Sequence, residues 1–263
     1  MIDHARRNAS LIFEHIGMNE AEESDVEIQG FDINERLDPD IWQPDQKMND
    51  EVRDRLLDIS EDFVSGLPFD VEVEDVKLTG SLATYNWSRF SDVDLHLVVD
   101  FSTVDDDEEL VKDYFNAKKT VWNLKHEIYI HGYEIEIYVE NVGDKHTAQG
   151  IYSIQKDEWI KKPEREFFEI DEEEVRKKAA SIMSQIEYIE EVSADEPAEA
   201  ERLAERAKEK IRKMRQSGLD SEKGIYSAKN VAFKVLRRNG YLERLSNVKT
   251  QSYDRVMSLS GMA

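Results

Sequence analysis

The 263-residue chain contains no cysteine. This absence excludes a disulfide framework, a thiolate zinc site and a cysteine nucleophile, and it fits a reducing compartment. No apolar run reaches the length that spans a membrane, and residues 1–17 lack the long apolar stretch of a secretory signal. We therefore expect a cytoplasmic protein that has no membrane partner.

Three common catalytic motifs are also missing. The chain has no G-x-x-x-x-G-K-[ST], which excludes a P-loop enzyme, and no G-x-S-x-G, which argues against a common class of serine hydrolase. His126-Glu127 is followed by His131, one position too far along for the H-E-x-x-H of a zinc helix. Any catalytic chemistry must therefore come from another set of side chains.

Negative charge dominates the chain, but it is distributed unevenly. With 35 Lys+Arg against 58 Asp+Glu, the formal net charge is −23. Residues 202–263 hold 15 Lys/Arg and 6 Asp/Glu, a net of about +9, so residues 1–201 carry about −32. The acidic part repels nucleic acid, and we expect no duplex DNA partner. The basic part either attracts phosphates or an acidic partner, or faces the acidic part across a domain interface.

Hydrophobic periodicity divides the chain into three parts. Residues 1–47 are predicted to form a helix over 1–17 and then an acidic arm that contains Pro39 and Pro44. Residues 48–160 mix helices and strands, and residues 161–263 are all helical. We find no internal repeat and no low-complexity linker, so we expect two folded domains and an N-terminal extension.

Helices and strands alternate in the middle part. Helical spacing marks 48–66 and 105–125, and the second helix has this expected buried face: Leu110, Val111, Tyr114, Phe115, Val121 and Leu124. Alternation predicts strands at 70–78, at 92–99 and within 127–139, where Gly132 marks a turn. A short helix is expected around 82–87. Residues 144–163 are predicted to be irregular, with 150–153 as an ordinary turn or, alternatively, a wall of an acceptor site.

The last part of the chain has the pattern of a helical bundle. Asp171 and Glu174 form a capping box for its first helix, and Pro197 suits the first turn of the second, which ends near Gly218. Ser227 begins a third helix that ends at Gly240, and the remaining residues are predicted to add one or two short helices.

The most informative stretch is 78–101. Gly80-Ser81 is followed by ten residues and then by Asp92-Val93-Asp94, which opens an apolar run. Side chains two apart share one face of a strand, so Asp92 and Asp94 project together, and paired carboxylates suit hard cations such as Mg²⁺. Gly80 lets the backbone come close to a ligand, and Ser81 would start a short helix whose amides can receive a phosphate. This combination indicates phosphoryl or nucleotidyl transfer.

A third acid can come from the strand at 133–139, where Glu134 and Glu136 share one face. We favour Glu136, which lies deeper in the strand, and keep Glu134 as the alternative. His96 follows Asp94 by two residues on the same face, and a hydrogen-bonded structural role is favoured over a phosphate contact.

The pattern G-S-x10-D-h-D, with h apolar and a further acid on a later strand, resembles the DNA polymerase β-like nucleotidyltransferase superfamily, of the minimal nucleotidyltransferase type. The residues that carry the resemblance lie within about 48–140, and they are Gly80, Ser81, Asp92, Asp94 and Glu136. The resemblance implies an α+β fold: a nucleotidyltransferase-like mixed sheet with flanking helices, followed by a C-terminal helical domain. Glu136 departs from the superfamily, which more often has Asp at this position.

This resemblance implies a Mg²⁺-dependent nucleotidyltransferase that moves NMP from an NTP such as ATP to a hydroxyl. Asp92, Asp94 and Glu136 would hold two Mg²⁺, with Mn²⁺ as an alternative, and Glu136 could receive the hydroxyl proton. Gly80 and Ser81 would hold the β- and γ-phosphates.

Between the two motifs, Arg89 would neutralise phosphate charge, whereas Tyr85 and Trp87 either line the nucleotide pocket or pack against the short helix.

The acceptor stays open between a short RNA or tRNA end, a protein and a small molecule. Two other interpretations remain. One is a catalytically silent binding or regulatory module that acts through a protein partner, and the other is a nucleotide cyclase or oligonucleotide synthase.

Overall fold

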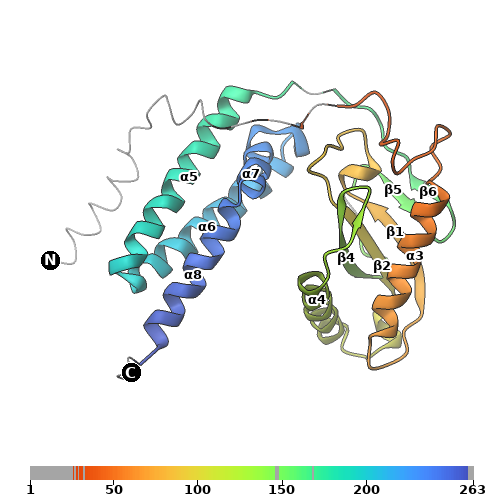
Figure 1. The fold of residues 1–263 in the computed structure, drawn as a ribbon, viewed down its shortest axis with the longest axis horizontal. Helices are drawn as coiled ribbons and strands as arrows, with labels where there is room; N and C mark the ends of the chain where they lie inside the picture. The colour runs from red at the N-terminus through yellow and green to blue at the C-terminus, as the bar shows by residue number, and fades with distance from the viewer. Residues whose placement is uncertain are drawn as a thin grey trace. The chain divides into compact units, whose positions relative to one another are not determined.

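The computed structural model describes residues 26, 28, 30, 31, 33–145, 148–167 and 169–259. The chain divides into two compact units (Figure 1). We call Gly30–Phe167 the head unit and residues 169–259 the tail unit. The helix predicted over 1–17 lies outside the described residues, as does most of the arm before residue 33. Among the described helices, none combines the length and the apolarity that a bilayer crossing requires.

The head unit is built on a six-stranded mixed sheet with the order β3-β4-β2-β1-β5-β6. Its strands are β1 (Val73–Thr79), β2 (Val93–Val99), β3 (Tyr129–Ile130), β4 (Tyr133–Asn141), β5 (Ile151–Ser153) and β6 (Glu158–Lys161). β2 and β4 are parallel, with α4 (Glu108–Lys125) between them in the chain, and the other neighbouring pairs are antiparallel. The predicted α+β class with a mixed sheet and a helical C-terminal part is therefore confirmed at this level.

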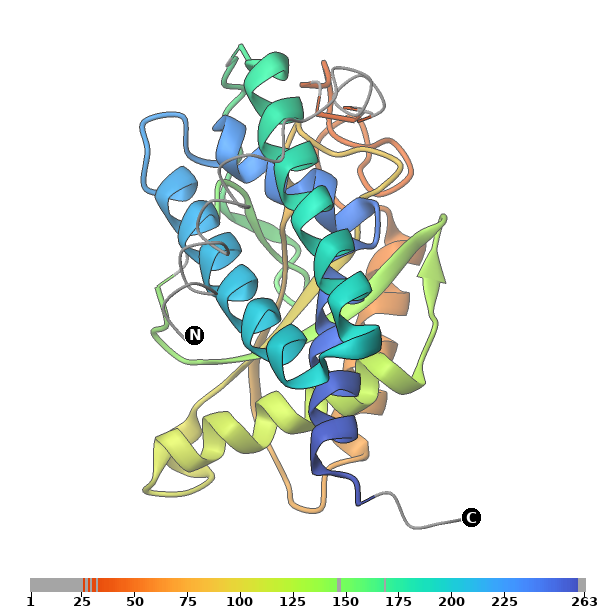
Figure 2. The same cartoon turned by 90° about the vertical axis from the view of Figure 1, so that its left-hand side faces the viewer.

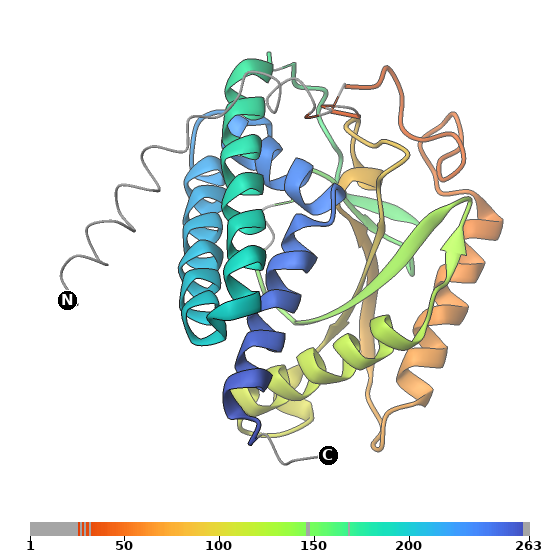
Figure 3. The same cartoon turned by 60° about the vertical axis from the view of Figure 1, so that its left-hand side comes forward.

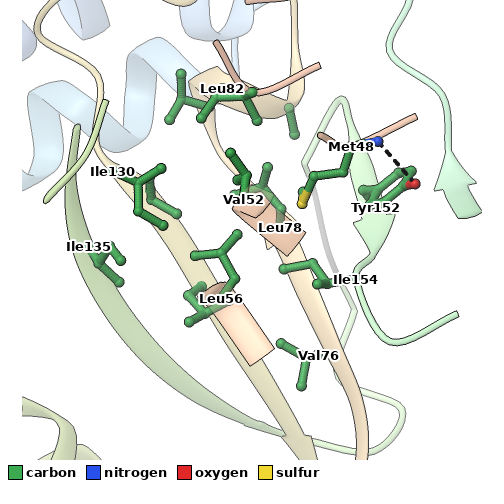
Figure 4. Close-up of a cluster of buried hydrophobic side chains, with 14 of the residues drawn as sticks. Met48, Val52, Leu56, Val76, Leu78, Leu82, Ile130, Ile135, Tyr152 and Ile154 are labelled. Carbon is green, nitrogen blue, oxygen red and sulfur yellow. Dashed lines mark hydrogen bonds between the residues drawn. The ribbon is translucent and has the colours of Figure 1, made fainter. Parts of the chain in front are cut away.

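Alternation along the central strands gives the sheet one apolar face. Seven side chains that point to it are at most 4% exposed: Val76, Leu78, Val93, Leu95, Leu97, Ile135 and Ile137. α3 (Asp50–Ser65) packs Val52, Leu56, Ile59 and Phe63 into the same cluster. Figure 4 shows Val52 and Leu56 beside Val76 and Leu78 of β1. The spacing of the four α3 residues keeps them on one side of the helix, which is why the sequence predicts it well. Most of the intervening strand positions, among them Asp94, His96 and Glu136, carry polar side chains to the opposite face.

The β3–β4 connection is a tight hairpin. His131 and Gly132 have positive φ angles of 50° and 89°, as a two-residue hairpin turn requires. The turn predicted at Gly132 is therefore confirmed.

The segment predicted to be irregular, 144–163, instead contains the β5–β6 hairpin. β5 pairs with β1, and Tyr152 is only 1% exposed, with its hydroxyl donating to Asp157 Oδ1 at 2.5 Å. The prediction of an ordinary turn at 150–153 is wrong, because β5 lies inside the sheet. The alternative of an acceptor wall stays a prediction. A strand of three residues, all buried, shows no alternation that a sequence pattern could detect.

α4 buries less of its surface than predicted. Val111 and Phe115 are buried, whereas Leu110, Val121 and Leu124 are 60%, 48% and 81% exposed. The helix lies along β4 at the edge of the sheet, so only a narrow stripe of it is covered. These three residues lie outside that stripe, and placing them on the buried face is wrong.

Asn123 of α4 also bonds to the backbone of β4. Its Nδ2 donates to Ile137 O at 3.1 Å, and its Oδ1 accepts from Ile137 N at 3.0 Å. The side-chain amide thus satisfies the two backbone groups of Ile137 that face away from β2.

Residues 33–47 of the arm belong to the head unit. Trp42 is 3% exposed, stacks on Trp159 with ring centroids 4.6 Å apart, and donates its Nε1–H to Leu82 O at 2.8 Å. Asn34 Nδ2 donates to Trp87 O at 2.7 Å. These contacts tie residues 33–47 to the segment that follows Gly80, so the compact unit starts before residue 48.

The tail unit is a bundle of four helices: α5 (Glu172–Asp195), α6 (Pro197–Leu219), α7 (Ala228–Arg238) and α8 (Tyr241–Met257). α5, α6 and α8 lie side by side (Figures 2 and 3). Asp171 caps α5 by accepting from Glu174 N at 2.9 Å, as the capping box predicts. α8 is one continuous helix of 17 residues, which is longer than the one or two short helices predicted for this segment.

Part of the basic charge of the tail unit is matched inside it. Arg244 pairs with Glu190, Lys249 with Glu205, and both Arg212 and Lys213 with Glu209. The Glu209 pairs lie within one helix and the other two join different helices, but all are largely exposed, so each adds little stability.

Candidate active site

The register of two neighbouring strands brings three carboxylates together. Asp94 of β2 lies directly opposite Glu136 in the parallel ladder with β4, and Asp92 comes immediately before β2 on the same face. One oxygen from each of Asp92, Asp94 and Glu136 lies within 4.8 Å of the other two, and all three side chains are half-buried. We call these three residues the acidic triad. Three carboxylates at this distance repel one another, and a shared cation relieves that repulsion.

Glu134, the alternative third acid, lies outside the triad. It is exposed and pairs with Tyr129 of β3. Glu136 is the glutamate that the β2–β4 register places opposite Asp94, so the two residues have different surroundings although they share a strand face.

The backbone of Gly80, directly after β1, lies against Asp94 of the triad. Thr79 at the end of β1 is opposite Asp94, and Gly80 then turns away with φ +75° and ψ −159°. A Cβ atom on Gly80 would lie 1.7 Å from Asp94 Oδ2. No side chain fits between this backbone and the carboxylate, so the glycine is required by both conformation and space.

Ser81 opens a single 3-10 turn, Ser81–Ala83, rather than the longer helix predicted around 82–87. Its Oγ is hydrogen-bonded to Ser91 Oγ at 2.7 Å, and Ser91 Oγ also accepts from Ser88 N at 3.0 Å. These bonds close the loop that leads from the Gly-Ser turn to Asp92. The Ser81 hydroxyl is therefore part of the loop structure.

Arg89 is exposed in the same loop, with its guanidinium carbon 4.6 Å from the centroid of the Phe90 ring. Trp87 Nε1 donates to Arg36 O at 2.9 Å, and Tyr85 O accepts from Asn34 N at 2.7 Å. Tyr85 and Trp87 thus help to hold the described part of the arm against the head unit.

His96 belongs to a polar network on the triad face of the sheet. Its Nδ1 is 2.9 Å from Glu140 Oε2, and its Nε2 is 3.1 Å from Thr79 Oγ1. Lys77 Nζ donates to the other oxygen of Glu140 at 3.0 Å. Both ring nitrogens are engaged by protein groups, which agrees with the structural role favoured for this histidine.

Two further side chains lie at or near the triad, and the sequence analysis gave neither of them a role. The Tyr138 hydroxyl donates to Glu136 Oε2, and Lys119 Nζ lies 4.3 Å from the centroid of the Tyr138 ring. Burial raises the pKa of the Tyr138 hydroxyl, and the hydrogen bond to Glu136 and the negative charge of Asp94 act in the same direction. Burial lowers the pKa of the Lys119 ammonium, while Glu136 opposes this change. Alternation along β4 does predict that Tyr138 shares a face with Glu136, but Lys119 is brought in only by the packing of α4.

Comparison with known proteins gives no guide to this site, because no family model, curated protein or solved structure matches the chain. The donor chemistry does fit a divalent cation. All three triad groups offer carboxylate oxygens, which are the ligands that Mg²⁺ and Mn²⁺ prefer.

Proposed function

We propose that the head unit is a Mg²⁺-dependent nucleotidyltransferase of the DNA polymerase β-like type, which moves NMP from an NTP to a hydroxyl acceptor. The observation that carries the proposal is the convergence of Asp92, Asp94 and Glu136 within 4.8 Å of one another, beside the backbone of Gly80. The sheet order supports it, since β2 lies between the strand that leads into Gly80-Ser81 and the strand that bears Glu136. The order along the chain, a strand, the Gly-Ser turn, the Asp-x-Asp strand, a helix and then the acidic strand, is the one that the resemblance implies.

The triad would hold two Mg²⁺, with Mn²⁺ as a substitute, and such ions activate the attacking hydroxyl and neutralise charge on the phosphates. The acceptor oxygen forms a bond to the α-phosphorus as the bond from that phosphorus to the pyrophosphate oxygen breaks. Glu136 would receive the hydroxyl proton as a general base. The products are the NMP ester of the acceptor, pyrophosphate and a proton.

The Gly80-Ser81 turn would bind the β- and γ-phosphates through its backbone amides, because the Ser81 hydroxyl is engaged with Ser91. Arg89, exposed in the same loop, would neutralise part of the triphosphate charge. The acceptor classes to separate are a short RNA or tRNA end, a protein side chain and a small molecule.

The test uses the full chain with each α-labelled NTP, Mg²⁺ and, in separate reactions, cellular RNA, protein and small-molecule fractions. We expect pyrophosphate release and label transfer to one fraction, both lost in an Asp92→Asn plus Asp94→Asn variant. The matched control is Glu134→Gln, which removes a neighbouring acid from the same strand and should keep the activity.

A nucleotide-only product would indicate a cyclase or an oligonucleotide synthase. Absence of pyrophosphate with every NTP and fraction, together with partner binding that survives the double substitution, would contradict the proposal and indicate a silent binding module.

A further inference from the structure

The side chain of Tyr138 is placed to control Glu136. The two residues share one face of β4, and the Tyr138 hydroxyl donates to Glu136 Oε2. Glutamate has one more side-chain torsion than aspartate, so a free Glu136 would sample more orientations than the other triad residues. A hydrogen bond from a fixed donor removes much of that freedom.

The donor itself is fixed from both neighbouring elements. The His96 ring of β2 stacks on the Tyr138 ring at 4.9 Å between centroids and 19° between planes. The Lys119 ammonium of α4 lies 4.3 Å from the centroid of the same ring. His96 is held in turn by Glu140 and Thr79. The phenol ring is thus anchored by an imidazole from β2 and a cation from α4.

We propose that Tyr138 is a positioning residue for metal binding, which holds the Glu136 carboxylate in the orientation that a divalent cation needs at the acidic triad. This inference rests on the proposed function. Side chains that orient metal ligands through hydrogen bonds commonly change metal affinity by about 10–100-fold when they are removed.

The test measures Mn²⁺ binding to the full chain by electron paramagnetic resonance, without nucleotide. An acidic protein binds Mn²⁺ weakly at many places, so triad binding is defined as the part lost in the Asp92→Asn plus Asp94→Asn variant. Tyr138→Phe removes only the hydroxyl and keeps the ring between His96 and Lys119. We expect it to raise the Mn²⁺ dissociation constant at the triad by about tenfold or more.

Two further variants separate positioning from general stability. Tyr133→Phe is the matched control, because Tyr133 is on the same strand and its buried hydroxyl also donates to a carboxylate, that of Asp38, outside the triad. It should leave Mn²⁺ affinity unchanged. A Tyr138→Phe plus Glu136→Gln double variant should bind no more weakly than Glu136→Gln alone, since the hydroxyl acts through Glu136. If Tyr138→Phe folds poorly, His96→Asn provides a second test, because it removes the ring that stacks on Tyr138; a loss of a few-fold is expected.

Unchanged triad affinity in Tyr138→Phe, or equal losses in Tyr138→Phe and Tyr133→Phe, would overturn the positioning role while leaving the proposed function intact. Wild-type protein that binds no more Mn²⁺ than the Asp92→Asn plus Asp94→Asn variant would instead overturn both.

Discussion

The two faces of the head-unit sheet come from the same strands but differ in how their residues interact. On the face under α3, side chains such as Leu95 and Ile137 are packed in one apolar cluster without directional bonds. On the opposite face, His96 and Glu136 each bond to particular partners. Because side chains alternate along a strand, one register positions both faces. The apolar face therefore fixes the distances at which the polar face can carry out chemistry.

Neighbouring residues Leu95 and Asp94 give the sharpest test of this difference. Leu95 is fully buried, so Leu95→Ala should lower the free energy of unfolding by about 2–5 kcal/mol, through lost burial and a cavity. Asp94→Asn should change that free energy far less, yet lose Mn²⁺ binding at the triad. Urea unfolding and Mn²⁺ titration of both variants check this, and equal stability losses would contradict a division between the faces.

Gly80 and Gly132 test whether the triad depends on close backbone approach. Both have positive φ, but an added Cβ meets Asp94 Oδ2 at 1.7 Å at Gly80 and nothing within 4 Å at Gly132. Gly80→Ala should cost about 1–3 kcal/mol and also abolish triad Mn²⁺ binding, because Asp94 must move. Gly132→Ala should cost stability alone. Intact Mn²⁺ binding in Gly80→Ala would show that the triad tolerates displacement of Asp94.

Glu136 and Glu134 test the polar face itself. Glu136→Gln should weaken triad Mn²⁺ binding by about tenfold or more, and it should slow label transfer. Glu134→Gln should alter neither measurement, because that side chain is exposed and outside the triad. The reverse result would assign the third ligand to Glu134.

The smallest effect is expected at Leu124 on α4, outside both faces. Leu124 is 81% exposed, so Leu124→Ser should change the free energy of unfolding by no more than about 0.5 kcal/mol. Phe115→Ser on the same helix is the comparison, since Phe115 is 1% exposed and should be strongly destabilising. A large loss at Leu124 would show that this residue is covered in solution.

The main elements of the fold could be predicted from the sequence because their apolar pattern repeats over many residues. Helix α3 and strands β2 and β4 each repeat their pattern over several turns or pleats. The β5–β6 hairpin could not be predicted, because its strands are only three and four residues long and are defined by pairing with β1 and with each other. The burial of α4 was overestimated because the spacing of apolar residues along a helix does not reveal how much of that helix the sheet covers.

The order of the motifs in the sequence identified the triad residues. It did not predict the contacts that these residues make. Asp92 and Asp94 share a face by alternation alone. The choice of Glu136 over Glu134 depends on the β2–β4 register, which places Glu136 opposite Asp94. The contacts of Tyr138 with His96 and Lys119 depend on cross-strand stacking and helix packing, and no local pattern encodes them.

The amide of Asn123 has a consequence for self-association. Beyond the short β3 pairing, the outer edge of β4 would offer Ile137 N–H and C=O to any extended chain that approached. Asn123 already occupies both groups with the donor and acceptor that a foreign strand would bring. This position on the sheet is thereby closed to strand addition from another molecule, which is a route by which exposed sheet edges polymerise.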